Sequence, residues 1–257
     1  MKRNSLLHRF FRNACPPFIR DNRKLCLFLA KRMVNREAMD MLSDFRMKLP
    51  HMSEEELRQY YEKLSVLLPQ GAEYIDVNSD CLKYILDYAN AHPEMHTYLD
   101  CACGGGKLTL MLCEIGKKST GVDFVLTDEL KNNSAASFVQ SDICSIPFEN
   151  KSFDVVISAH TLEHIIRIQD AITELRRVTK HTLIIIVPCQ REYKYTFETH
   201  VHFFPYPESF HRIMENPEGK CFLLGDDILY IEENEYSKLK TGEEQHENTH
   251  FRSKKAI

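Results

Sequence analysis

The stretch YLDCACGGGKLT, residues 98–109, decides the fold. Two apolar residues lead into Asp100, Cys101 and Cys103 flank an alanine, and three glycines run directly into a helix-like pattern. A glycine-rich turn between a strand and a helix is a ligand site in open α/β sheets, because strand carboxyl ends and helix N-termini converge there. The stretch lacks the GxxxxGK(S/T) pattern of a P-loop and the GxGxxG spacing of dinucleotide-binding proteins. Asp100, just before the turn, favours a ligand that carries an ammonium group.

Strand-like and helix-like segments alternate from residue 97 to about residue 233. This alternation predicts a mostly parallel sheet with helices on both faces. The predicted strands cover residues 97–102, 118–124, 137–142, 153–159 and 182–188, and the helices between them cover 107–116, 126–133 and 167–180. A short helix is expected over 207–216. Residues 220–233 read as two strands joined at Gly225 and Asp226, which predicts an antiparallel hairpin at the sheet edge.

The residues before the alternating region read as helical, with breaks at prolines. Ser53 is the expected N-cap of a helix over 53–68, and another helix is expected over 78–92. We therefore divide the chain into a helical, basic N-terminal extension (1–78), an α/β domain (79–234) and a polar, flexible tail (235–257).

Charge is distributed unevenly along the chain. Residues 1–36 hold ten Lys or Arg and one acid, Asp21, so they carry +9. The whole chain has 33 basic and 37 acidic residues, so the remainder holds 23 and 36 and carries −13. We expect the basic arm to be a solvated helical extension, with peripheral contact to an anionic membrane as the alternative.

The nine cysteines and the lack of long apolar runs bear on the compartment. No run approaches the length of a membrane span, and no signal segment is visible. Cysteines in that context predict reduced thiols in a cytoplasmic protein. The basic arm leaves membrane association as an alternative. Their spacing does not form a pair of CxxC units, so a zinc ribbon is not expected.

Four motifs in register resemble the class I S-adenosylmethionine-dependent methyltransferases. The first is YLDCACGGG, 98–106. The second is TGVDF, 120–124, and the third and fourth lie in VQSDICSIPFENKSFDVVISAHTLEHI, 139–165. The resemblance covers about residues 80–233. It implies a Rossmann-like sheet of order 3-2-1-4-5-7-6 with strand 7 antiparallel, and S-adenosylmethionine as the cofactor, with S-adenosylhomocysteine as its product.

The resemblance also implies which residues bind the cofactor. Asp123 would bind the ribose hydroxyls, Asp142 would meet the adenine amino group and Ile143 would line the ring. The remaining implied contacts are Asp100, Ala102, Cys103, Gly104, Gly106, Phe124 and His160. The family usually has glycine where this chain has Ala102, so a negative φ there would be unstrained and a positive φ would carry strain.

The acceptor side is predicted from position. His160 ends the fourth strand, and residues 191–210 form an aromatic-rich insertion after the fifth, which would either cover the acceptor or pack on the core. We predict His160, His200 or His202 as the general base. A helical turn in HTLEHI would put His160 and His164 on one face, as for metal ligands or an acid–base pair. We predict no metal, because Cys101 and Cys103 have no further ligands in view and His200 and His202 lack a third ligand.

Together these features predict methyl transfer to an oxygen of a small molecule or of a saccharide in polysaccharide biosynthesis. One alternative is a catalytically inactive, cofactor-binding partner subunit. Another is a nucleic-acid methyltransferase that uses the basic arm. Against the latter, the fourth strand is not followed by (D/N)PP(Y/F), and no Pro-Cys nucleophile motif is present. The sequence indicates no oligomeric state.

Overall fold

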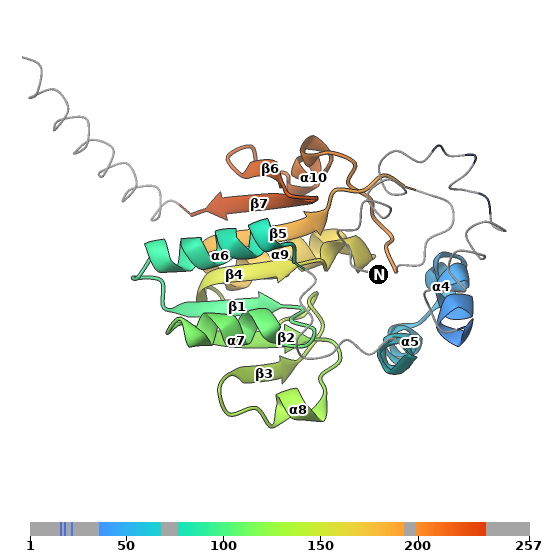
Figure 1. Cartoon of the computed structure of the whole chain (residues 1–257), viewed down its shortest axis with the longest axis horizontal. Helices are drawn as coiled ribbons and strands as arrows, with labels where there is room; N and C mark the ends of the chain where they lie inside the picture. Colours follow the sequence, from blue (N-terminus) through green and yellow to red (C-terminus); the bar gives the residue numbers. More distant parts are fainter. Residues whose placement is uncertain are drawn as a thin grey trace, which may run out of the picture.

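The computed structural model describes residues 36–67, 77–192 and 199–234, together with the isolated residues 16, 18 and 22. Element labels are those of Figure 1, where helices flank a central twisted sheet. The predictions for the basic arm and for the tail after residue 234 fall almost entirely outside the described residues.

Seven strands form one sheet in the order β3-β2-β1-β4-β5-β7-β6. The first five are parallel, and β7 runs antiparallel to both β5 and β6. Both the order and the direction of β7 confirm the predicted fold class. The strands are β1 (Thr97–Cys101), β2 (Lys118–Asp123), β3 (Ser137–Gln140), β4 (Phe153–Ala159), β5 (Thr179–Pro188), β6 (Lys220–Leu224) and β7 (Asp227–Glu233).

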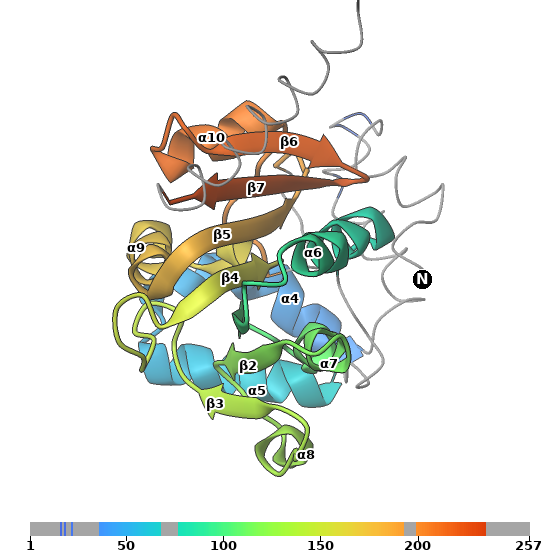
Figure 2. The same cartoon turned by 90° about the vertical axis from the view of Figure 1, so that its left-hand side faces the viewer.

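Helices cover both faces of the sheet, as Figure 2 shows. α6 (Ser79–Ala91) and α7 (Lys107–Glu114) pack on one face, while α9 (Ile168–Val178) and α10 (Pro207–Met214) pack on the other. Successive strand residues point to opposite faces, so Val156 joins the α9 side and its neighbours Val155 and Ile157 join the α6 side. The sheet interior is therefore apolar on both sides, which explains the unbroken apolar runs of β4 and β5.

Most predicted elements appear close to their expected bounds, with one overlap. The helix predicted over 167–180 ends at Val178, because Thr179 and Lys180 already belong to β5 and pair along β4. α8 (Asp128–Lys131) is shorter than the segment predicted for it, and η2 (Leu162–His164) is a single 3₁₀ turn after β4.

Asn78 ties the start of α6 to the β6–β7 hairpin. Its Oδ1 accepts the N–H groups of Asp80 and Cys81 at 2.9 Å, which is an N-cap. Its Nδ2 donates to the carbonyl of Leu224 at 3.0 Å and to Asp227 Oδ2 at 2.8 Å. One side chain thus fixes both the first turn of a helix and the turn of a hairpin far away in the chain.

Two N-terminal helices lie beyond the carboxyl ends of the parallel strands (Figure 1). They are α4 (Arg36–Lys48) and α5 (Glu54–Leu67), joined by η1 (Leu49–His51). Ser53 caps α5 as predicted, in a reciprocal pair with Glu56: Ser53 Oγ accepts the Glu56 N–H at 3.3 Å, and Glu56 Oε2 accepts the Ser53 N–H at 2.8 Å.

The α4–α5 pair is attached to the segment that follows β5. Its small core of Phe45, Leu49 and Tyr60 also contacts Val201. Arg46 forms an ion pair with Glu192 at 2.7 Å and stacks over the ring of Phe203 at 5.0 Å. The helices are therefore anchored to the segment after β5, on the side of the carboxyl ends of the parallel strands, where ligands bind in open α/β folds. Within the described ranges, no helix is both long and apolar enough to cross a membrane.

Candidate functional site

The glycine-rich turn after β1 adopts a left-handed backbone at three positions. Ala102, Gly104 and Gly106 have φ values of 60°, 52° and 74°. The turn is held by hydrogen bonds from the Cys103 N–H to the Val122 carbonyl at 3.0 Å and from the Gly106 N–H to the Cys103 carbonyl at 2.8 Å. Ala102 thus has the positive φ that carries strain, at a cost of about 1–2 kcal/mol for a residue with a Cβ.

The glycines of this region serve different purposes. A Cβ on Gly106 would lie 2.7 Å from the ring of Phe138, and one on Gly121 of β2 would lie 2.6 Å from the same ring. These two glycines are needed because β3 packs tightly against the turn. A Cβ on Gly104 would meet nothing within 4 Å. Gly104 therefore presents bare backbone to open space, where a ligand can approach closely.

Asp100 lies buried beneath the turn. Its Oδ2 accepts the hydroxyl of Thr109, in the first turn of α7, at 2.7 Å. Burial raises the pKa of Asp100 to about 6, even though the hydrogen bonds from Thr109 lower it. Thr109 has no predicted role in the sequence. Its position in the first turn of the helix that follows the glycine-rich turn is the feature that could have pointed to a contact with Asp100.

Asp123, at the end of β2, is joined directly to the glycine turn. Its Oδ2 accepts the Gly104 N–H at 2.8 Å and its Oδ1 accepts the Val125 N–H at 3.0 Å. Burial raises the pKa of this carboxyl, and the backbone hydrogen bonds oppose the rise. Each carboxylate oxygen has a second lone pair, so the group can accept further hydrogen bonds from a ligand. Phe124, the next residue, is half-buried.

The residues after β3 complete this side of the sheet edge. Asp142 Oδ1 accepts the Cys144 N–H at 2.8 Å, which shapes the turn. Ile143 is buried in the core that also contains Leu99 and Cys101. The predicted cofactor residues therefore come from the carboxyl ends of the adjacent strands β1, β2 and β3, which the parallel register brings to one edge.

His160 lies between two buried acids at the end of β4. Its backbone has a φ of 52°, and its N–H donates to the carbonyl of Ile186 at 2.8 Å. The ring Nε2 lies 3.0 Å from Asp227 Oδ2, and Nδ1 lies 3.4 Å from Glu163 Oε1. Both ring nitrogens thus face carboxylates, and helix η2 begins after His160, at Leu162.

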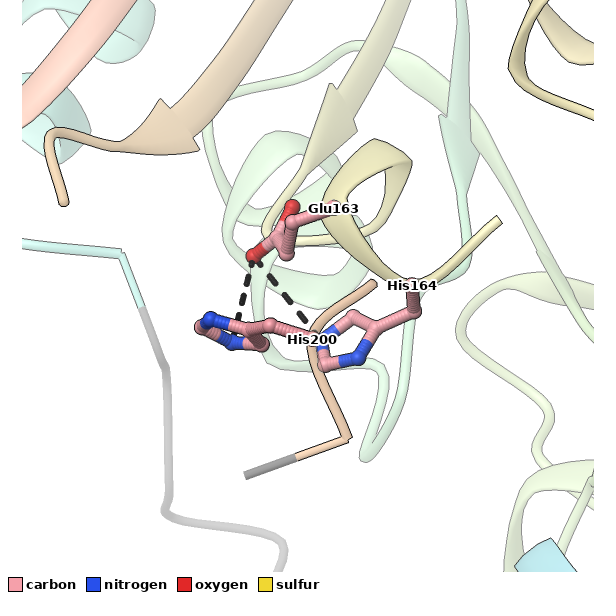
Figure 3. A group of neighbouring side chains, drawn as sticks. All are labelled: Glu163, His164 and His200. Carbon is pink, nitrogen blue, oxygen red and sulfur yellow. Dashed lines mark ion pairs between the residues drawn. The ribbon is translucent and has the colours of Figure 1, made fainter. Parts of the chain in front are cut away.

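Glu163 is the residue around which the histidines gather, as Figure 3 shows for His164 and His200. Burial raises the pKa of Glu163, but the contact with His160 and the nearby imidazoles lower it to about 2. His202, by contrast, directs Nε2 to the carbonyl of Ile165 at 2.9 Å. Glu163 has no predicted role in the sequence, because its neighbour His200 comes from a distant segment.

Part of the aromatic insertion belongs to the core. Phe204 and Phe210 are buried and meet edge to face at 4.9 Å. Phe203 is half-buried beneath Arg46. Of the two predictions for this segment, packing on the core therefore holds for Phe204 and Phe210, while residues 193–198 lie outside the described residues.

The matched sequence family is a methyltransferase domain, which covers residues 99–187. Curated relatives include 2-phytyl-1,4-naphtoquinone methyltransferase of Trichormus variabilis, 27% identical over 49% of this chain and 60% of that protein. Ubiquinone biosynthesis O-methyltransferase of Rickettsia akari is 28% identical over 43% of this chain and 48% of its own length. Sterol 4-C-methyltransferase of Caenorhabditis elegans is 33% identical over 32% of this chain and 27% of its own length. The chain thus spans 27–60% of the length of these relatives.

Solved structures agree on the fold. Magnesium protoporphyrin IX methyltransferase of Synechocystis PCC 6803, with bound S-adenosylhomocysteine, has a TM-score of 0.51 and 13% identity, and covers 71% of this chain and 100% of its own. The same enzyme with bound S-adenosylmethionine has a TM-score of 0.50. Residues 99–187 therefore match a methyltransferase-domain family, and the strand order of the sheet is that of the class I methyltransferase fold.

Proposed function

We propose that this chain is an S-adenosylmethionine-dependent methyltransferase that acts on an oxygen of a small molecule or saccharide. The observation that carries the cofactor half is the pairing of Asp123 with Gly104. A carboxylate and a stretch of bare backbone lie together at the carboxyl edge of the sheet, with open space beside them.

Three acids would hold the cofactor. Asp123 would accept the ribose hydroxyls with its remaining lone pairs. Asp142 would reach the adenine amino group through Oδ2, since its Oδ1 already accepts the Cys144 N–H. Asp100 would balance the positive charge of the methionine part from beneath the turn. When bound, S-adenosylmethionine supplies a methyl group on a positively charged sulfur, so the protein mainly has to align the acceptor with it.

The choice of oxygen as the acceptor atom draws support from position. An acceptor hydroxyl must lose a proton, and histidine is the side chain suited to take it near neutral pH. His160, His200 and His202 all follow the carboxyl ends of β4 and β5. In His160 both ring nitrogens already face Asp227 and Glu163, so we favour a positioning role for it. A relative named as an O-methyltransferase is consistent with this choice.

Binding of the cofactor is tested by isothermal titration of the full chain with S-adenosylmethionine and S-adenosylhomocysteine. A bidentate, charge-assisted contact contributes on the order of 1.5–3 kcal/mol. Asp123→Ala is therefore expected to weaken binding by roughly tenfold to hundredfold. The matched control is Asp128→Ala, whose side chain is 96% exposed on α8. Equal affinity of Asp123→Ala and Asp128→Ala would contradict the assignment.

The acceptor class is tested next, with labelled methyl donor and three sets of acceptors: hydroxylated small molecules, saccharides and RNA or DNA. Label in the first or second set supports the proposal. Label in nucleic acid alone favours the alternative of a nucleic-acid methyltransferase that uses the basic arm. Cofactor binding with no turnover on any set, and with turnover appearing on addition of a second protein, favours the partner-subunit alternative.

A further inference from the structure

Three side chains from two distant segments point their ligand atoms at one spot beside β4. Glu163 and His164 belong to η2, and His200 follows β5 (Figure 3). Glu163 Oε1 lies 3.8 Å from His164 Nε2 and 3.9 Å from His200 Nε2. All three ligand atoms lie within 4.8 Å of one another. These separations are too long for hydrogen bonds. They are slightly longer than the roughly 3.4 Å that separates neighbouring ligands around a tetrahedral ion with 2.0–2.2 Å bonds.

Each imidazole has its other nitrogen held by an acceptor. His164 Nδ1 lies 3.0 Å from the carbonyl oxygen of Thr199, which can only accept, and 2.9 Å from the Thr199 hydroxyl, which can accept as well. His200 Nδ1 lies 3.0 Å from Gln190 Oε1, also an acceptor. The proton of each neutral ring is therefore on Nδ1, and the lone pair of each Nε2 faces the carboxylate. Metal-binding histidines show this arrangement, in which an outer hydrogen bond sets the tautomer.

The carboxylate itself requires a positive partner. Glu163 is fully buried, and neither of its oxygens has a hydrogen-bond partner within the described ranges. The contact with His160 Nδ1, at 3.4 Å, is long for a hydrogen bond. A buried carboxyl group that lacks hydrogen-bond partners is costly, whatever its protonation state. A cation between Glu163 and the two imidazoles would satisfy the carboxylate and both lone pairs at once.

We propose that Glu163, His164 and His200 bind one divalent transition-metal ion. Two imidazoles and one carboxylate suit Zn²⁺, Mn²⁺ or Fe²⁺ better than Mg²⁺ or Ca²⁺, which prefer oxygen ligands. Three protein ligands leave at least one coordination position open, as in catalytic rather than structural sites. If the proposed function holds, that position is the place for the acceptor oxygen, because η2 follows the strand next to β1.

His160 and Asp227 act as positioning residues for this site. His160 Nε2 lies 3.0 Å from Asp227 Oδ2 and its Nδ1 faces Glu163 Oε1, so the imidazole links the two buried carboxylates. No metal is predicted from the sequence, in which His200 and His202 lack a third ligand. The fold supplies two ligands from the HTLEHI segment and turns His202 away toward Ile165.

The test is metal binding by the full chain, separate from methyl transfer. The protein is stripped with a chelator and titrated calorimetrically with ZnCl₂ and, separately, with MnCl₂, without S-adenosylmethionine. We expect one tight site per chain for at least one of these ions. Glu163→Gln, His164→Asn and His200→Asn are each expected to weaken it at least a hundredfold. The control is His211→Asn, on α10, where the ring bonds to the carbonyl of Asn216 at 3.0 Å.

Two measurements keep the test decisive if a variant folds poorly. The first is circular dichroism of each variant at the titration temperature. The second is the thermal midpoint, which the metal should raise in the native chain and in His211→Asn but not in Glu163→Gln. Failure to find a site, or binding that Glu163→Gln leaves unchanged, overturns the proposal and means that protons on the histidines balance Glu163. Titration with S-adenosylmethionine on the same samples shows independently whether the proposed function stands.

Discussion

Asn78 and His160 meet at a single oxygen atom: Asp227 Oδ2 lies 2.8 Å from Asn78 Nδ2 and 3.0 Å from His160 Nε2. Asp227 is buried at the first position of β7, directly after the hairpin turn. Through Asp227, the cap of α6 is therefore connected to the imidazole that faces Glu163. The network links the outer edge of the sheet to the cluster at the end of β4.

Asn78→Ala should destabilise the protein by about 1.5–5 kcal/mol. Loss of the N-cap costs on the order of 0.5–2 kcal/mol, and a buried carboxylate that loses a donor costs roughly 1–3 kcal/mol more. Chemical denaturation measures the total. Asn78→Ser separates the two parts, because serine can cap the helix but cannot reach Asp227. Native stability in Asn78→Ser would mean that the Asp227 contact contributes nothing.

Gly104→Ala should mainly reduce cofactor affinity, whereas Gly106→Ala should mainly reduce stability. Both substitutions force a left-handed backbone on alanine, which costs roughly 1–2 kcal/mol. At Gly106 the new methyl group also meets Phe138 at 2.7 Å, which adds about 1–3 kcal/mol of overpacking. At Gly104 it enters open space. We expect Gly106→Ala to lose more stability, and Gly104→Ala to lose cofactor affinity while staying folded; calorimetry and thermal melts on both variants check this. The reverse pattern would show that the open space beside Gly104 is not the ligand site.

Asp100→Asn should raise stability at pH 7 while weakening the cofactor. The folded-state pKa of Asp100 is about 6, above the value of about 3.9 in an unfolded chain. A raised pKa of an acid means that the folded state loses stability as the pH rises from about 4 to 6, by about 2–3 kcal/mol. Asparagine carries no charge, so denaturation curves of the variant should lack this loss. A variant whose stability still falls by that amount between pH 4 and 7 would rule out Asp100 as its source.

Asp154 should make the fold sensitive to acid. Burial alone would raise its pKa, but the N–H groups of Thr97 and His96, the Thr97 hydroxyl and Lys180 lower it to about 2. A folded-state pKa below the unfolded value stabilises the fold above about pH 4, and this contribution, about 2 kcal/mol, disappears as the pH falls toward 2. Denaturation midpoints measured from pH 5 to pH 2 should fall steeply in the native chain and less steeply in Asp154→Asn. Parallel curves would contradict the assignment.

The basic arm should be dispensable for cofactor binding. The contacts described for Asp100, Asp123 and Asp142 are all made by residues outside 1–35, so we expect unchanged affinity for S-adenosylmethionine after deletion of that segment. Sedimentation with phosphatidylserine vesicles at low and high salt tests the membrane alternative. Strong binding that salt and the deletion both abolish would show that the arm is a membrane-contact segment rather than a solvated extension.

The sequence by itself determined the architecture of the α/β unit. Strand and helix periodicity are local properties and predicted a mostly parallel sheet. The order of its strands was implied by the resemblance of the motifs at 98–106, 120–124 and 139–165 to the class I methyltransferases. For the same reason the sequence placed Asp100, Gly104, Asp123 and Asp142 at one edge, since parallel strands end on the same side. The capping pair of Ser53 and Glu56 was readable too, because it spans a single turn.

Only the tertiary structure decided which distant side chains meet. The cluster of Glu163, His164 and His200 depends on how the segment after β5 folds back over η2, where Glu163 accepts the N–H groups of Val201 and His202 at its carbonyl. The periodicity of the sequence does not predict this fold-back. The 36 residues that separate His164 from His200 in the sequence say nothing about the distance between them in space. The left-handed φ of Ala102 and the burial of Phe204 arise in the same way, from packing across elements, which overrides what each residue prefers locally.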